Sequence, residues 1–196
     1  MSYQTLLYTV EDAIATITLN RPEALNTIVP PMPDEIEAAV NAAVRDERIK
    51  VIILRSAGRS FCGGLRLRRR IPPMGRAHHH RRRVGGGSDY ALCADLVIAS
   101  EDARIGTPHS RMWGAWLSGM WLHRLGLTKA KEFALTGKPL SGRAVRGLQP
   151  GSAGPAAGPE ERDPVTIDAV VSVENRRANR GRAGIMRGSL SSSGTP

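Results

Sequence analysis

The chain has 196 residues, a mass of 21.1 kDa and 41% apolar residues, which is enough for one globular domain with a core. No apolar run approaches the ~20 residues of a membrane span, and the first ten residues lack the basic flank of a secretory signal. Cys62 and Cys93 are the only two cysteines and form no CxxC pair, which argues against a disulfide scaffold or a zinc site. We therefore expect a cytoplasmic protein with no metal and no membrane segment.

The formal net charge of +10 comes from two segments. Residues 65–83 hold eight Arg and no acid, and residues 144–196 hold seven Arg against five acids. The first segment has no aromatic residue on which a base could stack, so the sequence does not favour nucleic-acid binding. His78–His80 do not favour a metal site either, because adjacent side chains point in different directions and no acid lies nearby.

The predicted elements begin with a strand and a helix. Residues 11–20 alternate between apolar and polar positions, which predicts a half-buried strand that ends at the turn Asn20-Arg21-Pro22. Pro33-Asp34-Glu35 then predicts a helix start, since proline and acids suit the first turn. The helix has one apolar face, made by Ile36, Val40 and Val44.

The centre of the chain continues the alternation of strands and helices. Residues 51–54 and 96–99 are wholly apolar runs, which are typical of strands covered on both faces. Residues 128–136 are helical in character, and Gly137 is the expected C-terminal stop. This order of elements predicts an α/β fold.

Two segments break the pattern. In residues 144–196, 26 of 53 positions are Gly, Pro, Ser or Arg and none is aromatic, so only residues 165–173 could add to a core. We expect a domain at 1–143, in which 65–83 is an atypical Arg/His-rich segment, and a poorly ordered tail at 144–196. Such a bias also arises when a GC-rich coding region is read in a shifted frame, a hypothesis that resequencing the gene would test.

Two glycine-rich turns carry the chemistry. The first is Arg59–Gly64, after the strand at 51–54, and the second is Gly85–Asp89, before a predicted helix at 90–94. Glycine allows a turn with positive φ and a close approach of backbone to ligand. Backbone N–H groups fixed in such turns stabilise the oxyanion of a reacting thioester, and loss of one donor costs ~100- to 1000-fold in rate.

Residues 1–64 and 84–143 resemble the enoyl-CoA hydratase/isomerase (crotonase) family. The first block contains an alternating strand, LNRPEALN, a helix, VIIL and SFCGG, and the second contains GGGSDYALCADLVIASEDARIGTP and LGLTKAKEFALTGKPLSGR. The resemblance implies an α/β crotonase-like fold, a superhelix of repeated ββα units. We expect this superhelix to be incomplete here and to be followed by an irregular C-terminal tail.

The resemblance also implies acyl-CoA chemistry on a CoA thioester, of the hydratase or isomerase type, in fatty acid metabolism and without a bound cofactor. The backbone N–H groups of Gly63 and Gly86 would hold the thioester oxygen. Ala24, Leu25 and Cys62 would bind CoA together with these two glycines. A homo-trimer or hexamer is expected by the same resemblance.

The sequence departs from the family at the acid/base positions. Hydratases of the family use two glutamates, and Asp89 stands at the first of these positions. At the second, Gly106-Thr107-Pro108 is followed by His109 and Ser110, of which His109 could act as a base near neutral pH. The reaction type therefore stays open. The alternative is a degenerate, catalytically inactive member that at most binds CoA or a partner.

The segments at 65–83 and 144–196 also depart from the family pattern. In the family a helix and a buried strand lead into the second glycine turn, and here residues 76–83 stand in that strand's place. Their unpaired charges would each cost several kcal/mol in a buried strand, so we expect the sheet to lack one member or to be badly formed there. The tail offers no amphipathic helix like those that build the family's trimer.

Several residues also have a purely structural interpretation. We expect Cys62 to pack under its turn rather than act as a nucleophile, because the sequence places no base beside it. Trp113, Trp116 and Trp121 are expected in the core or a lid. For Asp89 two interpretations stay open, a first-turn residue stabilised by the helix dipole and a proton-transfer group.

Overall fold

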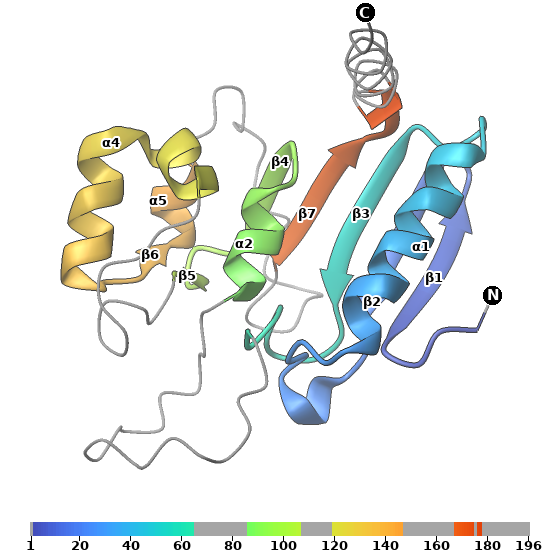
Figure 1. The fold of residues 1–196 in the computed structure, drawn as a ribbon, viewed down its shortest axis with the longest axis horizontal. Helices are drawn as coiled ribbons and strands as arrows, with labels where there is room; N and C mark the ends of the chain where they lie inside the picture. The colour runs from blue at the N-terminus through green and yellow to red at the C-terminus, as the bar shows by residue number, and fades with distance from the viewer. Residues whose placement is uncertain (1, 65–85, 107–118, 147–166, 175, 178–196) are drawn as a thin grey trace, which may run out of the picture.

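The computed structural model describes residues 2–64, 86–106, 119–146, 167–174, 176 and 177 (Figure 1). These ranges form a five-stranded sheet, with helices across one of its faces, and a separate two-stranded sheet. The mixture of strands and helices confirms the α/β class. Within the described part of the chain, no helix has the length and apolar content needed to cross a membrane.

The elements follow the predicted order through the first two thirds of the chain. They are β1 (Leu6–Glu11), β2 (Ile14–Leu19), η1 (Pro22–Ala24), α1 (Pro31–Arg45), β3 (Val51–Ser56), α2 (Gly86–Leu92), β4 (Leu96–Ala99), β5 (Arg104–Ile105), α4 (Gly119–Thr136), β6 (Leu140–Ser141), α5 (Gly142–Arg146) and β7 (Ile167–Ser172).

The N-terminal half of the sheet is built as the alternation predicts. β1 and β2 form an antiparallel hairpin, and β3 then pairs with β2 in parallel. The inward residues Ala15, Ile17 and Leu19 of β2 are completely buried. Helix α1 packs on them through the small residues Ala39 and Ala43, which let the helix approach the sheet closely.

Helix α4 contains the helix predicted at 128–136 and begins earlier, at Gly119. Its backbone is interrupted at Gly126, where φ is 68° and ψ is 164°. The predicted stop is confirmed, because Gly137 has a φ of 61° and donates its N–H to the Phe133 carbonyl at 2.9 Å.

Residues 76–83, on which the expected defect in the sheet depends, lie outside the described residues. The strand order is β1-β2-β3-β7-β4, so β7 lies between β3 and β4 (Figure 1). β7 pairs antiparallel with both β3 and β4, so β3 and β4 run in the same direction and are separated by one strand. This intervening strand comes from residues 167–172, far along the sequence from both of its neighbours.

Strand β7 is fixed by polar contacts as well as by its ladders. Its buried carboxylate Asp168 lies 3.4 Å from the Arg55 guanidinium of β3. The Ser172 N–H donates to the Asp95 carboxylate at 2.7 Å. Beyond the strand, Arg177 donates to the carbonyls of Val44 and Asp46 at 3.1 and 3.0 Å. The strand is therefore attached to three other elements or loops near the sheet.

The prediction that both apolar runs are covered on both faces is wrong for the outer face. Val97 and Ala99 of β4 are buried against the helices, whereas Leu96 and Ile98 are 44% and 52% exposed. Val51 and Ile53 of β3 are half-buried on that same outer face. Among the described residues, α1 and α2 both lie on the inner face, which leaves the outer face accessible to solvent.

Candidate functional site

The first glycine turn follows β3 and is bonded to an upstream loop. Phe61 and Cys62 are buried, and Gly64 adopts a φ of 83°. The Gly63 N–H donates to the Leu25 carbonyl at 2.8 Å, and the Ile28 N–H donates to the Gly64 carbonyl at 2.8 Å. The predicted oxyanion donor Gly63 therefore has a carbonyl partner within the chain.

The loop that supplies this carbonyl is held by a buried amide. Asn26 is completely buried, and its Oδ1 accepts from the Arg21 N–H at 2.7 Å. Its Nδ2 donates to the carbonyls of Ala57 and Ser60 at 2.9 and 2.7 Å. Asn26 stands in the LNRPEALN motif, and its role was not predicted, although Asn is a residue type enriched at positive φ and adopts 50° here.

The two glycine turns meet at Gly87 and Cys62. A Cβ atom on Gly87 would lie 2.3 Å from the Cβ of Cys62, so only glycine fits at this contact. A Cβ atom on Gly86 would lie 3.3 Å from Cδ1 of Ile28. The structure thus brings Gly63, Gly86 and the loop at Leu25 into one region.

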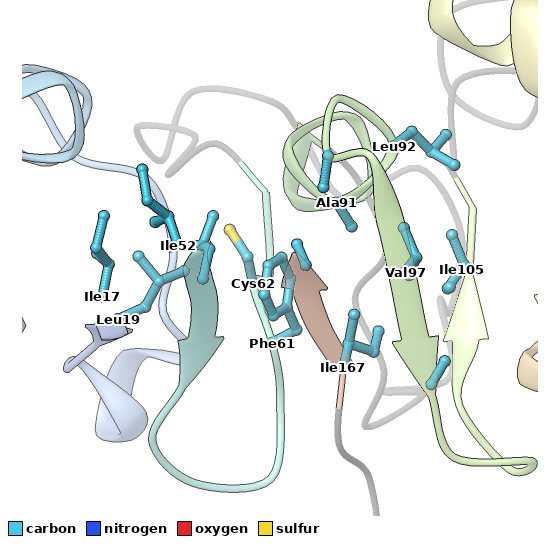
Figure 2. Packing of buried hydrophobic residues seen from close by; sticks show 14 of the residues in the cluster. Ile17, Leu19, Ile52, Phe61, Cys62, Ala91, Leu92, Val97, Ile105 and Ile167 are labelled. Atoms are coloured by element: carbon cyan, nitrogen blue, oxygen red, sulfur yellow. The ribbon is translucent and has the colours of Figure 1, made fainter. Parts of the chain in front are cut away.

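Gly86 is the first residue of α2, where backbone N–H groups have no partner within the helix and the helix dipole is positive. Figure 2 shows Phe61 and Cys62 in the core cluster, with Ile52 of β3 on one side and Ala91 of α2 on the other. The first turn of α2 is therefore placed on the core beside the end of β3.

A serine that the sequence analysis did not single out joins the second glycine turn to the Gly106 segment. The buried Ser88 hydroxyl donates to the Gly106 carbonyl at 2.9 Å and accepts from the Gly106 N–H at 3.1 Å. The sequence signal that could have indicated Ser88 is its position directly after three glycines, at the start of a helix. The predicted base His109, along with Thr107 and Pro108, lies outside the described residues.

Asp89 lies on the first turn of α2 and is half-exposed. Its Oδ1 accepts a hydrogen bond from Nε1 of Trp121 at 2.9 Å. Trp121 is completely buried and stacks on Phe133 with a centroid distance of 4.3 Å. The expectation that Trp121 is a core residue is confirmed, while Trp113 and Trp116 lie outside the described residues.

The two cysteines are free and differ in exposure, Cys62 being buried and Cys93 exposed. Burial raises the pKa of the Cys62 thiol, although a backbone hydrogen bond from Gly64 works in the opposite direction. A thiol with a raised pKa is a poor nucleophile at neutral pH. This agrees with the expectation that Cys62 packs under its turn.

Comparison with known proteins gives the family. The enoyl-CoA hydratase/isomerase family model matches residues 9–83 and 77–147. A probable enoyl-CoA hydratase of Rhizobium meliloti is 29% identical over 165 residues, which are 70% of this chain and 63% of the relative. The probable peroxisomal enoyl-CoA hydratase 1 of Arabidopsis thaliana is 30% identical over 154 residues, which are 65% of this chain and 57% of the relative.

Solved structures agree with the sequence matches. An enoyl-CoA hydratase from Mycobacterium smegmatis superposes with a TM-score of 0.64 and 31% identity, covering 75% of this chain and 64% of that one. This likeness shows the crotonase fold over three quarters of the chain. The chain spans only 57% and 63% of the length of the two curated relatives. The chain belongs to the enoyl-CoA hydratase/isomerase family.

Proposed function

We propose that the chain binds a CoA thioester and acts on it as an enoyl-CoA hydratase or isomerase through an oxyanion hole. The observation that carries the proposal is the meeting of the two glycine turns, where Gly87 contacts Cys62 too closely for any other residue. This contact places the backbones of Gly63 and Gly86 on adjoining segments. Two backbone donors from adjoining turns are what a developing thioester oxyanion requires.

The Gly63 donor would have to change partner. Its N–H is bonded to the Leu25 carbonyl, so a thioester oxygen takes this donor only when that carbonyl turns away. Leu25 has a φ of 53°, and a left-handed backbone costs a non-glycine residue about 1–3 kcal/mol. Turning the peptide between Leu25 and Asn26 changes ψ of Leu25 and φ of Asn26 and leaves φ of Leu25 as it is, so this strain does not offset the cost of the turn.

The remaining site residues divide into CoA contacts and proton-transfer groups. Ala24 and Leu25 are half-buried and so have surface to offer to CoA, whereas buried Cys62 contributes by packing. Asp89 and His109 act on protons in the proposal. A carboxylate at the first turn of α2 and an imidazole from the segment after Gly106 could serve as acid and base, which leaves hydration and isomerisation both open.

The competing proposal is an inactive remnant that at most binds CoA or a partner. It is favoured by the Gly63–Leu25 hydrogen bond, since an occupied donor cannot also stabilise an oxyanion. It is also favoured by His109 at the position where the family's second glutamate is expected.

A short enoyl-CoA assay together with CoA-binding calorimetry on the purified chain separates the two. Turnover that is lost in Asp89→Asn supports the enzyme, with an expected loss of ~100-fold or more for removal of a general acid or base. Binding of CoA without turnover supports the remnant. The absence of both binding and turnover would reject the enzyme and leave a remnant that does not bind CoA.

The cellular setting and the assembly belong to the same proposal. We infer a role in fatty acid metabolism in the cytoplasm, which the two free thiols support because disulfides are rare in reducing compartments. We also infer a trimer or hexamer. The exposed apolar side chains of Leu96 and Ile98 support assembly, since a partner could cover this outer face. Light scattering on the eluted protein would show the assembly, and a monomer would reject it.

A further inference from the structure

Helix α4 is attached to α2 at two separate places. Near the start of α2, Nε1 of Trp121 donates to the Asp89 carboxylate at 2.9 Å. At the last residue of α2 and just beyond, the Arg124 guanidinium donates to the carbonyls of Leu92 at 3.1 Å and of Asp95 at 3.3 Å, and also to that of Ala94. One turn of α4 thus holds both ends of the helix that carries the second glycine turn.

The indole of Trp121 is itself fixed. Its side chain is completely buried, and its ring stacks on Phe133 at 4.3 Å with an angle of 11° between the planes. An indole is a donor only, with a single N–H whose direction follows the ring plane. Because the ring cannot turn within this packing, the N–H is aimed at one place, and Asp89 occupies that place.

Asp89 needs such a partner more than most helical residues do. Helix α2 has only seven residues, so it relies on tertiary contacts rather than on its own stability. The terminal torsion of an aspartate is also broad, which leaves the direction of its carboxylate undetermined by the backbone. A misplacement of about 1 Å in a reacting group can cost ~100-fold in rate.

We propose that Trp121 is a positioning residue that holds the Asp89 carboxylate in place for proton transfer beside the two glycine turns. The inference rests on the proposed function, in which Asp89 acts on a substrate proton. Arg124 fixes the other end of α2 through hydrogen bonds to backbone carbonyls, so we expect its contribution to be to stability.

The test uses Trp121→Phe, which keeps an aromatic ring against Phe133 and removes the N–H. We expect kcat to fall 10- to 100-fold while KM changes less than about threefold, because the Asp89 carboxylate loses its fixed direction while the binding surface is kept. In an Asp89→Asn background the same substitution should cause no further loss. Arg124→Met is the matched control, and we expect lower thermal stability with kcat unchanged per folded molecule.

A second readout does not depend on activity. In a ¹H–¹⁵N spectrum the indole N–H signal of Trp121 is assigned by its loss in Trp121→Phe. We expect slow hydrogen exchange of this signal, and at least tenfold faster exchange in Asp89→Ala.

The outcomes separate the inference from the proposed function. If the hydrogen-exchange rate of the indole N–H is the same in Asp89→Ala as in the wild type, the contact does not exist. The inference is then rejected whether or not the chain is active. If the wild-type chain turns over substrate and Trp121→Phe keeps its kcat, the positioning role is overturned. If the wild-type chain has no turnover while the indole signal responds to Asp89→Ala, the proposed function and the catalytic part of the inference both fail, and only the contact stands.

Discussion

Gly87 shows how one missing side chain can decide the geometry of a site. Its backbone lies against Cys62 so closely that the Cβ of an alanine would fall 2.3 Å from Cβ and 2.6 Å from the carbonyl oxygen of Cys62. Backbone atoms cannot yield as the end of a flexible side chain can. The contact between the two glycine turns therefore depends on glycine at this position.

We expect Gly87→Ala to lower the free energy of unfolding by about 1–3 kcal/mol, the usual range for overpacking, and to abolish any turnover. Urea unfolding and the enoyl-CoA assay measure the two effects. Gly119→Ala is the control, because nothing lies within 4 Å of the added Cβ, and its stability should stay equal or rise slightly. Equal stability of both variants would show that the turns do not meet as described.

The two thiols give a second prediction at the residue scale. Burial raises the pKa of both thiols, so the two differ in exposure, Cys93 being exposed and Cys62 buried. A thiol reagent at neutral pH should label one cysteine in the native chain and both in denaturant, with Cys93→Ser removing the fast reaction. Mass spectrometry of the labelled peptides gives the site. Rapid native labelling of Cys62 would mean that the packing under the first glycine turn is open.

At the scale of elements, local patterns predicted local structure well. The alternation of β2, the one-sided face of α1 and the stop at Gly137 each depend on neighbouring residues, and each is found in the structure. The pairing of β7 could not be predicted in this way. Its partners β3 and β4 lie far away in the sequence, and no pattern within residues 167–172 specifies which strands they pair with.

The candidate site shows the same difference between features set by neighbouring residues and contacts between distant ones. The roles of the glycines at 63 and 86 stay predictions from motif and resemblance, and the described contact between their two turns is that of Gly87 with Cys62. The partner of the Gly63 N–H was missed, because a left-handed Leu25 has no sequence signature. The Ser88–Gly106 and Asp89–Trp121 pairs were missed because both connect residues that only the folded chain brings together.

Proline in β7 tests whether the sheet depends on this strand. Ala169 is buried and pairs with Leu54 on one side and Val97 on the other. Ala169→Pro should remove a ladder hydrogen bond from an interior strand and cost about 3 kcal/mol or more. The control is Val170→Thr on the half-exposed outer face, where we expect a change within about 1 kcal/mol. Urea unfolding followed by circular dichroism measures both, and an unaffected Ala169→Pro chain would remove β7 from the fold.

Glu35 connects α1 to the start of β1 and gives the fold a pH dependence. Its carboxylate accepts the N–H groups of Gln4 and Thr5 at 2.7 and 2.9 Å. Burial pushes the pKa of Glu35 upward, but the hydrogen bonds from Thr5 and Gln4 together outweigh it, so the pKa lies below its usual 4.5. A lowered pKa in the folded state contributes stability that is present above pH 4.5 and is lost as the pH falls below that value.

We therefore expect the urea midpoint of the wild-type chain to drop as the pH is lowered from 4.5, and Glu35→Gln to flatten that part of the curve. At pH 7 the variant should be the less stable of the two, since it lacks the charged acceptor. Parallel curves for both proteins between pH 3 and pH 7 would contradict this explanation.

At the scale of the whole molecule, the chain carries the family's fold over fewer residues than its relatives have. It spans 57% of one curated relative and 63% of another, and its fifth strand comes from the C-terminal segment. The inner face of the sheet is a continuous core, whereas Leu7, Ile14, Leu96 and Ile98 remain exposed on the outer face. An exposed apolar face of this kind is a site for association with a partner, and it promotes aggregation at high concentration when no partner covers it.

The position of β7 has a consequence for how the protein is made. Chains emerge from the ribosome from the N-terminus at about 5–20 residues per second, so β3 and β4 exist for several seconds before residues 167–172 are available. During that interval both strands present unpaired edges beside each other, and such edges recruit strands from other chains. Residues 167–172 thus close the middle of the sheet only after both of its neighbouring strands have been synthesised, and in that interval the edges of β3 and β4 are open to pairing with other chains.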